Sequence, residues 1–164
     1  MNVDAILDAF NRHEVAYLLI GGMNFALRHV PILTYDIDFW IEDTAENLGR
    51  CERALASLNA EWGPSEEDWQ PVRDRPPGWL DRQSVFCLTS PHGPIDVFRA
   101  VEGLGAWAES RRRAQRCHTT AGTPFVSLSD EDMLQCQLAL PEPRRKRDRI
   151  EMLRRSLRER EDHG

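Results

Sequence analysis

Several features that define other classes of protein are missing from this sequence of 164 residues. No apolar run approaches the length of about 18 residues that spans a bilayer, and the opening MNVDAILDAF has acids where a secretory signal has basic residues. No CxxC pair or CxxH group is present, which argues against a zinc site. We therefore expect a cytoplasmic protein without membrane contact, whose cysteines are small core residues: Cys51, Cys87, Cys117 and Cys136.

The composition is that of a single globular domain. With 41% hydrophobic and 29% charged residues, the chain is unlike a mostly disordered protein. Its length is enough for one buried core and short for two, and it has no internal repeat. We expect one domain over residues 1–164, with an α/β core over residues 1–128 and helices over residues 129–164.

Charge is distributed unevenly along the chain. The net charge of −6 argues against a broad nucleic-acid-binding surface. Residues 1–143 hold 12 basic and 22 acidic residues, whereas residues 144–164 hold 9 basic and 5 acidic ones. The basic C-terminal segment either binds an RNA acceptor such as tRNA or an acidic partner, or its arginines pair with its own interleaved acids.

Hydrophobic periodicity predicts alternating helices and strands. The expected helices are 3–12, one starting directly after Gly21 and Gly22, 45–58, 104–113, one starting at the N-cap Ser129, and 144–160. The expected strands are 16–20, 35–41, a hairpin formed by 84–90 and 95–99, and an extended segment at 123–128. This order predicts an α+β fold in two layers, with a small mixed sheet flanked by helices and a C-terminal helical segment.

The segment 61–82 has no sustained period, and we expect a long surface loop there. It contains Trp62, Trp69 and Trp79. These rings either form a lid or an acceptor-binding surface, or tie the loop to the body of the protein.

Two acids stand inside an apolar strand in the sequence YDIDFWI. Alternation places Ile37 on one face and both Asp36 and Asp38 on the other, about 6.6 Å apart along the strand. Two carboxylates at that distance repel by about 2.5 kcal/mol at an effective dielectric constant of about 20. A divalent cation between them would remove this cost, and Mg²⁺ prefers such oxygen ligands.

A third acid and a glycine pair extend this pattern. Asp96 lies in another predicted strand, IDVFR, and would converge with the first two acids if the strands are neighbours. Three acids suit two-metal phosphoryl transfer. Gly21 and Gly22 precede a helix, where exposed backbone N–H groups can approach a phosphate closely.

The order of strand, Gly21-Gly22, helix, Asp36-x-Asp38 and later Asp96 resembles the nucleotidyltransferase superfamily related to DNA polymerase beta. Within that superfamily, the chain is most similar to small bacterial nucleotidyltransferases related to abortive-infection toxins. Their C-terminal pattern is comparable to SDEDMLQCQLALPEPRRKRDRIEML here. The resemblance covers about Val15 to about Leu153, and it implies the nucleotidyltransferase fold.

The resemblance also implies roles for individual residues. Gly21 and Gly22 would contact a triphosphate, Asp36 and Asp38 would hold Mg²⁺, and Asp96 would complete the metal site and activate the acceptor hydroxyl. Two Mg²⁺ ions are implied, with Mn²⁺ as the alternative ion. Arg147 and Asp148 match a basic-acidic pair that would orient phosphate or fix the last helix.

Three further residues flank the predicted site. Asn24 and Thr34 either hydrogen-bond the nucleotide or act as caps of the local backbone. Arg99 follows the third acid closely and either contacts phosphate or pairs with a surface acid.

Two departures from the family pattern bear on function. Ile32 and Gln137 stand where members of this group often have an arginine and a lysine. We therefore weigh two hypotheses. In the first, the protein transfers a nucleoside monophosphate from an NTP such as ATP to a hydroxyl of RNA or tRNA, a protein or a small molecule. In the second, it is a weak or inactive binding module with a cognate protein partner, as in a toxin–antitoxin pair.

Overall fold

The computed structural model describes residues 1–164, and its centre is a six-stranded mixed sheet. The strand order is β5-β6-β2-β1-β8-β7. The central pair β1/β2 is antiparallel, each of these strands has a parallel partner on its other side, and the outer pairs are again antiparallel. The strands are β1 (Tyr17–Ile20), β2 (Ile37–Ile41), β5 (Val85–Leu88), β6 (Ile95–Phe98), β7 (Gln115–His118) and β8 (Pro124–Ser127).

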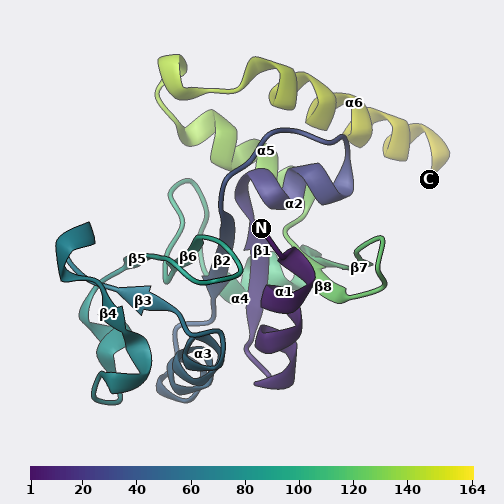
Figure 1. Cartoon of the computed structure of the whole chain (residues 1–164). Coiled ribbons are helices and arrows are strands. Elements are labelled where there is room, and N and C mark those ends of the chain that lie inside the picture. The colour runs from purple at the N-terminus through teal and green to yellow at the C-terminus, as the bar shows by residue number, and fades with distance from the viewer.

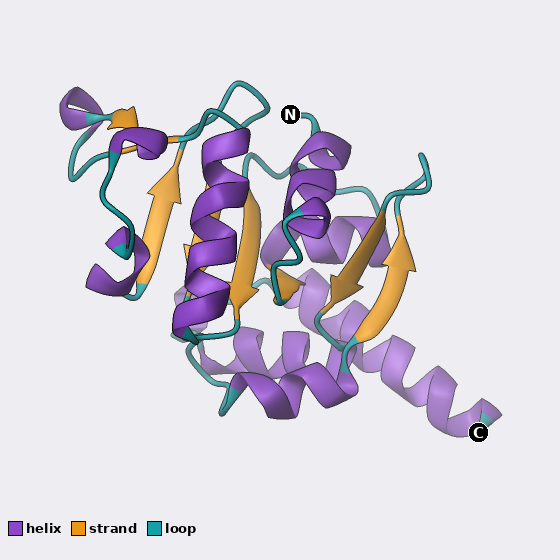
Figure 2. Ribbon diagram, turned by 90° about the horizontal axis from the view of Figure 1, so that it is seen from below, coloured by secondary structure: helices purple, strands orange, loops and turns teal.

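Helices cover the sheet in two groups (Figures 1 and 2). The helices are α1 (Val3–Arg12), α2 (Gly21–Arg28), α3 (Ala45–Ser57), α4 (Trp107–Arg113), α5 (Asp130–Ala139) and α6 (Arg147–His163). Figure 2 shows α1 and α3 in front of the strands, whereas α5 and α6 form the upper layer in Figure 1 and α6 extends past the sheet. The predicted α+β fold with a mixed sheet is confirmed.

Alternation along β2 separates the two faces of the sheet. Ile37, Phe39 and Ile41 are fully buried in the larger core, against the apolar stripes of α1 and α3. The Phe39 ring stacks on Phe10 of α1 with 3.9 Å between ring centroids. Trp40 points to the other face and packs in a second cluster that includes residues of α5 and α6. Asp38 therefore lies on the face opposite Ile37, as the alternation predicted, and the structure places the C-terminal helices on that face.

The segment 61–82 has more structure than the sequence indicated. It contains the short strands β3 (Glu61–Trp62) and β4 (Gln70–Pro71), which pair with each other, and three short 3-10 helices, η1 (Glu66–Asp68), η2 (Val72–Asp74) and η3 (Trp79–Arg82). Trp79 is buried and lies near the ring of Trp62. Both rings also pack edge-on against Phe86 of β5, so they tie the insertion to the body of the protein. Elements of two to four residues are too short to produce a detectable period.

Two other differences concern strands. β7 was not predicted, because its residues QRCH are mostly polar and it is an edge strand with one face exposed. β2 begins at Ile37, so Asp36 lies just before the strand and not within it. Its carboxylate is placed by the preceding segment, which changes the spacing expected for Asp36 and Asp38.

None of the helices combines the length and the apolar character that crossing a bilayer requires. The fourth 3-10 helix, η4 (Glu142–Arg144), separates α5 from α6 at the predicted break LPEP.

Candidate active site

Three carboxylates converge at one end of the central strands. Asp38 of β2 and Asp96 of β6 are direct partners in the parallel register, so their side chains lie on the same face. Asp36 approaches from the segment before β2. One carboxylate oxygen from each of the three residues lies within 4.8 Å of the others. The structure therefore brings together the three acids that the sequence singled out.

This arrangement concentrates negative charge in a partly buried place. Burial, with repulsion from Asp36 and Asp96, raises the pKa of Asp38 to about 7. The pKa of Asp96 is also raised, first by burial and then by the charge of Asp36. Such a cluster is stabilised by a cation, and a donor set made only of carboxylate oxygens fits Mg²⁺. The residues present thus fit the divalent metal that the motif implied.

The glycine pair begins α2 directly beside this cluster. Gly21 has a positive φ of 67°, and a Cβ at this position would overlap the Oδ2 atom of Asp38. A Cβ at Gly22 would lie 3.0 Å from the hydroxyl oxygen of Thr34. Only glycine allows the backbone to turn here at such close range. The free N–H groups at the start of α2 are consequently held next to the three acids.

A cation that the sequence analysis missed lies on the other side of this turn. Arg149 of α6 lies near the glycine pair, with its Nη2 atom 3.6 Å from the position of a Cβ at Gly22. Its guanidinium also lies 5.6 Å from the centroid of the Phe25 ring. It forms no salt bridge, because no acid lies within 4 Å of it. Nothing in the sequence distinguishes Arg149 from the eight other basic residues of the segment 144–164.

A cavity of about 410 Å³ opens between the acids and the C-terminal helices. Asp38 and Gly21 form one side, and Arg149 and Gln137 come from α6 and α5 on the other. The remaining lining residues are mostly apolar: Ile20, Phe25, Phe98, Val101, Glu102, Leu128, Met133, Cys136, Leu140 and Leu153. The cavity therefore combines an apolar wall with two acids, Asp38 and Glu102, and one arginine beside a glycine turn.

Two predicted basic residues lie outside this cavity. Arg147 has a side chain that is 87% exposed and lies 3.6 Å from Glu142. Arg99 forms salt bridges with Asp43 and Asp81 and donates to backbone carbonyls of the 80–83 segment. Of the two roles expected for Arg99, the structure therefore shows pairing with surface acids and no place in this cavity. Elsewhere in the C-terminal helix, Arg155 pairs with Glu159, in line with the self-paired alternative.

Asn24 and Thr34 occupy positions around the glycine turn. Asn24 is fully buried, donates to the carbonyl of Leu128 and accepts from the hydroxyl of Ser127. It joins α2 to the end of β8. Thr34 lies against Gly22, where its hydroxyl is 3.4 Å from the carbonyl oxygen of Asp36. Thr34 thus lies at the glycine turn, whereas the side chain of Asn24 is hydrogen-bonded within the fold.

The two positions where a cation was expected have other contacts. Ile32 packs against the smaller apolar cluster, which includes residues of α5 and α6. Gln137 lines the cavity, and its side-chain oxygen accepts from the backbone N–H of Lys146, which fixes the start of α6. Arg149, two residues inside that helix, brings a positive charge to the same cavity from a different element.

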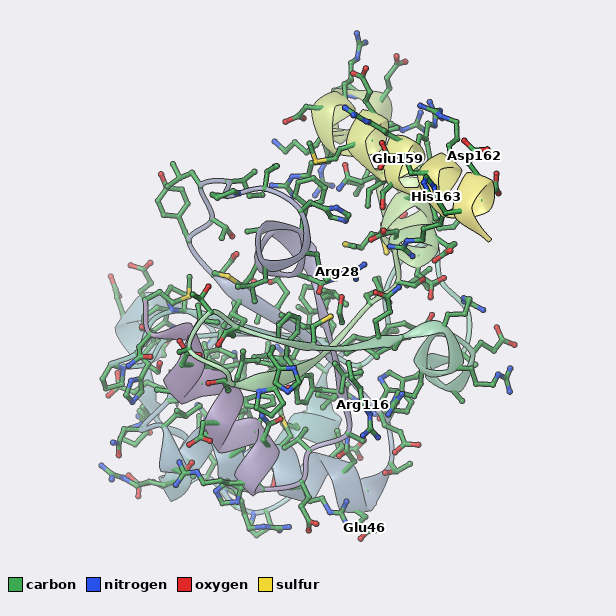
Figure 3. All side chains as sticks on the ribbon, turned by 90° about the vertical axis from the view of Figure 1, so that its right-hand side faces the viewer. Arg28, Glu46, Arg116, Glu159, Asp162 and His163 are labelled. Atoms are coloured by element: carbon green, nitrogen blue, oxygen red, sulfur yellow. The ribbon has the colours of Figure 1, made fainter.

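A buried carboxylate fastens α6 to the rest of the site. Asp130 is fully buried and accepts hydrogen bonds from Arg28, His29, Ser156 and Arg160. In Figure 3, Arg28 lies below the C-terminal helices, whereas Glu159, Asp162 and His163 lie on α6 itself. Burial alone would raise the pKa of Asp130, but the hydrogen bond from His29 and the charge of Arg28 hold it below its ordinary value. This network joins α2, α5 and α6.

The cysteines are all free, and only Cys51 is buried as predicted. Cys87 is exposed on β5, directly opposite Asp96 in the register. Although the residue is exposed, partial desolvation of its sulfur and the neighbouring charge of Asp96 raise the pKa of this thiol to about 11. The expectation of a core role for Cys87 is wrong, because the alternation of β5 directs it to the face that carries the acids.

Comparison with known proteins finds the same fold in several solved structures. No family model and no curated protein matches the sequence. The lincosamide antibiotic adenylyltransferase LnuA, in its lincomycin-bound structure, has a TM-score of 0.59 at 17% identity, over 91% of this chain and 92% of LnuA. The antibiotic-resistance factor ANT(2'')-Ia has a TM-score of 0.52 at 16% identity, over 97% of this chain and 90% of that protein.

A third similar structure is TM1012 from Thermotoga maritima, a protein assigned as a nucleotidyltransferase. It has a TM-score of 0.51 at 19% identity, over 94% of this chain and 89% of that one. Identities this low show a shared fold. The chain therefore has the nucleotidyltransferase fold, and the relationship that its motifs predicted is confirmed at that level.

Proposed function

We propose that this protein is a Mg²⁺-dependent nucleotidyltransferase that moves a nucleoside monophosphate from an NTP to a hydroxyl group. The observation that carries the proposal is the meeting of Asp36, Asp38 and Asp96 beside the Gly21 turn. The same fold in two proteins named for antibiotic adenylylation or resistance supports it. Their names also favour a small-molecule acceptor over RNA or protein.

The residues of the site divide the reaction between them. Asp36, Asp38 and Asp96 would hold the metal, which when bound neutralises phosphate charge and aligns the attacking and leaving oxygens. The N–H groups at the start of α2 would bind the triphosphate, together with Thr34. Arg149 would supply the positive charge that Ile32 and Gln137 do not.

The transfer step follows from these positions. The acceptor oxygen attacks the α-phosphorus and forms a new O–P bond, while the bond between that phosphorus and the oxygen bridging to the β-phosphate breaks. Pyrophosphate leaves with the electron pair. The hydroxyl proton passes to an Asp96 carboxylate oxygen, which acts as the general base.

A direct experiment combines binding and transfer. Each of the four NTPs, labelled at the α-phosphate, is incubated with Mg²⁺, a bacterial lysate and either the parent protein or the double variant Asp36→Ala, Asp38→Ala. Transfer by the parent alone is the expected result. The midpoint of thermal unfolding should rise with Mg²⁺ plus the preferred NTP, since a ligand that binds only the native state stabilises it. No transfer and no shift for the parent would contradict the proposal.

The alternative of a binding module within a toxin–antitoxin pair stays a prediction. It needs a site that has lost its hold on triphosphate, and Arg149 beside the glycine turn disfavours that. A protein that binds no Mg²⁺·NTP yet arrests growth on expression, and is released by a cognate partner, would favour the alternative.

A further inference from the structure

A straight row of residues crosses the face of the sheet that carries the acids. In the strand registers, Ile20 of β1 is opposite Asp38, Asp38 is opposite Asp96, and Asp96 is opposite Cys87 of β5. Partners on one face of neighbouring strands lie about 5 Å apart. The row therefore runs from the glycine turn that follows Ile20, through two of the three acids, to the edge strand of the sheet.

The two ends of this row have different roles if the proposed function holds. In phosphoryl transfer, the attacking and leaving oxygens lie roughly in line on opposite sides of the phosphorus. The glycine turn and Arg149 occupy one end, where pyrophosphate would leave. The acceptor hydroxyl would therefore arrive from the other end, past Asp96 and Cys87.

A second cavity, of about 490 Å³, lies at that end. Val85 and Cys87 of the edge strand form one wall, and the turn between β3 and β4 forms the other. The residues of that turn and its surroundings are Trp62, Gly63, Pro64, Ser65, Glu66, Trp69 and Gln83. We refer to this cavity as the edge groove.

The two tryptophans of the edge groove, Trp62 and Trp69, differ in their packing partners. Trp62 packs with Trp79 and Phe86, and the guanidinium of Arg75 lies 4.5 Å from its ring centroid. Trp69 is half-buried and has no ring or guanidinium partner. Its ring is an aromatic surface in the groove that the fold of the insertion does not use.

The rim of the edge groove is acidic. Glu66 lines the groove, and Glu67 and Asp68 follow it in η1. All three are exposed and none forms a salt bridge, while Asp68 accepts a hydrogen bond from the hydroxyl of Ser65. Such a rim repels the phosphates of a nucleic acid and attracts a cation. An aromatic ring beside carboxylates is also a recognition site for an amine.

We propose that the edge groove binds the acceptor and that the acceptor is a small hydroxyl-bearing molecule with a positively charged amine. Trp69 lies against its body, Glu66 faces its amine, and its hydroxyl reaches past Cys87 to Asp96. This assignment rests on the proposed function and adds the side of entry and the class of acceptor.

The test uses the full chain and α-labelled NTPs with Mg²⁺. Transfer of label is measured separately to the small-molecule, RNA and protein fractions of a bacterial lysate. The variants are Trp69→Ala, Trp69→Phe and Glu66→Lys. Asp74→Lys is the matched control, because it makes the same charge change in the same insertion at an exposed residue outside the groove. Thermal stabilisation by Mg²⁺·NTP is measured for every variant.

Label should appear in the small-molecule fraction. Trp69→Ala and Glu66→Lys should each lower it about tenfold, because each removes one aromatic or ionic contact to the acceptor. Trp69→Phe and Asp74→Lys should keep most of it, and all four should keep the Mg²⁺·NTP stabilisation.

Two results would overturn the inference and leave the proposed function standing. These are label on RNA or protein, and label on a small molecule that Trp69→Ala and Glu66→Lys leave unchanged. Mg²⁺·NTP stabilisation without transfer to any fraction would overturn both the transfer activity and the inference. Failure of the parent to be stabilised by any Mg²⁺·NTP would overturn the proposed function itself, and the inference with it.

Discussion

Gly21 and Asp38 are in such close contact that the carboxylate of Asp38 occupies the space where a side chain at position 21 would begin. The turn that would bind phosphate and the acid that would bind metal are therefore one packed unit. Gly21 also has a φ of 67°, which L-residues with a Cβ rarely adopt. Two independent physical reasons require glycine here.

A pair of glycine-to-alanine variants should distinguish the effect of the positive φ at Gly21 from the effect of its contact with Asp38. Gly21→Ala should cost about 1–2 kcal/mol through its backbone conformation, and should also displace Asp38 and abolish transfer. Gly122→Ala is the control, because Gly122 has a φ of 92° and its Cβ would meet nothing within 4 Å. Urea denaturation and the transfer assay measure both effects. Equal activity of the two variants would show that the contact with Asp38 has no role in the site.

The acidic cluster should make the metal-free protein less stable as the pH rises. Asp38 has an ordinary pKa of 3.8 and a folded pKa of about 7. Between these values the folded protein retains a proton that the unfolded chain releases, so the free energy of unfolding falls with rising pH. Asp38→Asn should remove much of this decline. Urea denaturation with a chelator at about pH 5 and about pH 7.5 compares the two proteins.

Two outcomes would count against that account of the cluster. One is a pH profile of the parent that runs parallel to the profile of Asp38→Asn. The other is a parent protein whose stability at neutral pH does not increase when Mg²⁺ is added, since the metal should relieve the repulsion that destabilises the cluster.

Arg149 should contribute to triphosphate binding. Arg149→Ala should weaken Mg²⁺·ATP binding about tenfold or more, because a charge-assisted contact to phosphate is lost. Arg147→Ala is the matched control, since that arginine is on the same helix, is 87% exposed and lies outside the cavity. Isothermal titration calorimetry of both variants with Mg²⁺·ATP shows which arginine of α6 contributes to triphosphate binding. A loss confined to Arg147→Ala would restore the role that the sequence motif implied for it.

The buried network around Asp130 should matter for stability. Asp130→Asn leaves the guanidinium groups of Arg28 and Arg160 without their charged partner, which should lower the free energy of unfolding by about 3–5 kcal/mol. Asp8→Ala should change it by less than about 1 kcal/mol, because the pair of Asp8 with Arg12 is exposed. Urea denaturation near neutral pH measures both.

The pH dependence of this network has the opposite sign to that of Asp38. The folded pKa of Asp130 is lowered, so its stabilising effect is present above its ordinary pKa and is lost as the pH falls through the folded value. Acid titration of the parent should therefore show a loss of stability that Asp130→Asn lacks. A loss of equal size in both proteins would mean that other carboxylates dominate acid unfolding.

The sequence by itself determined the elements that place the acids. The period of two in IDFWI set which side of β2 is buried, so Asp38 had to face the opposite side from Ile37 and Phe39. The glycine pair before a helical pattern and the hairpin that contains Asp96 were also visible, because turns and alternation depend on neighbours in the chain. These local rules were sufficient for the fold class and for the three acids.

Only the tertiary structure decided which residues surround the acids. Arg149, rather than Arg147, comes to the glycine turn because α6 is held by Asp130 in one rotation about its axis. Cys87 and the edge groove reach the site through the register of β5 and through an insertion whose elements are too short to show a period. Helix rotation, strand register and the packing of short elements depend on contacts between distant segments, so no local pattern encodes them.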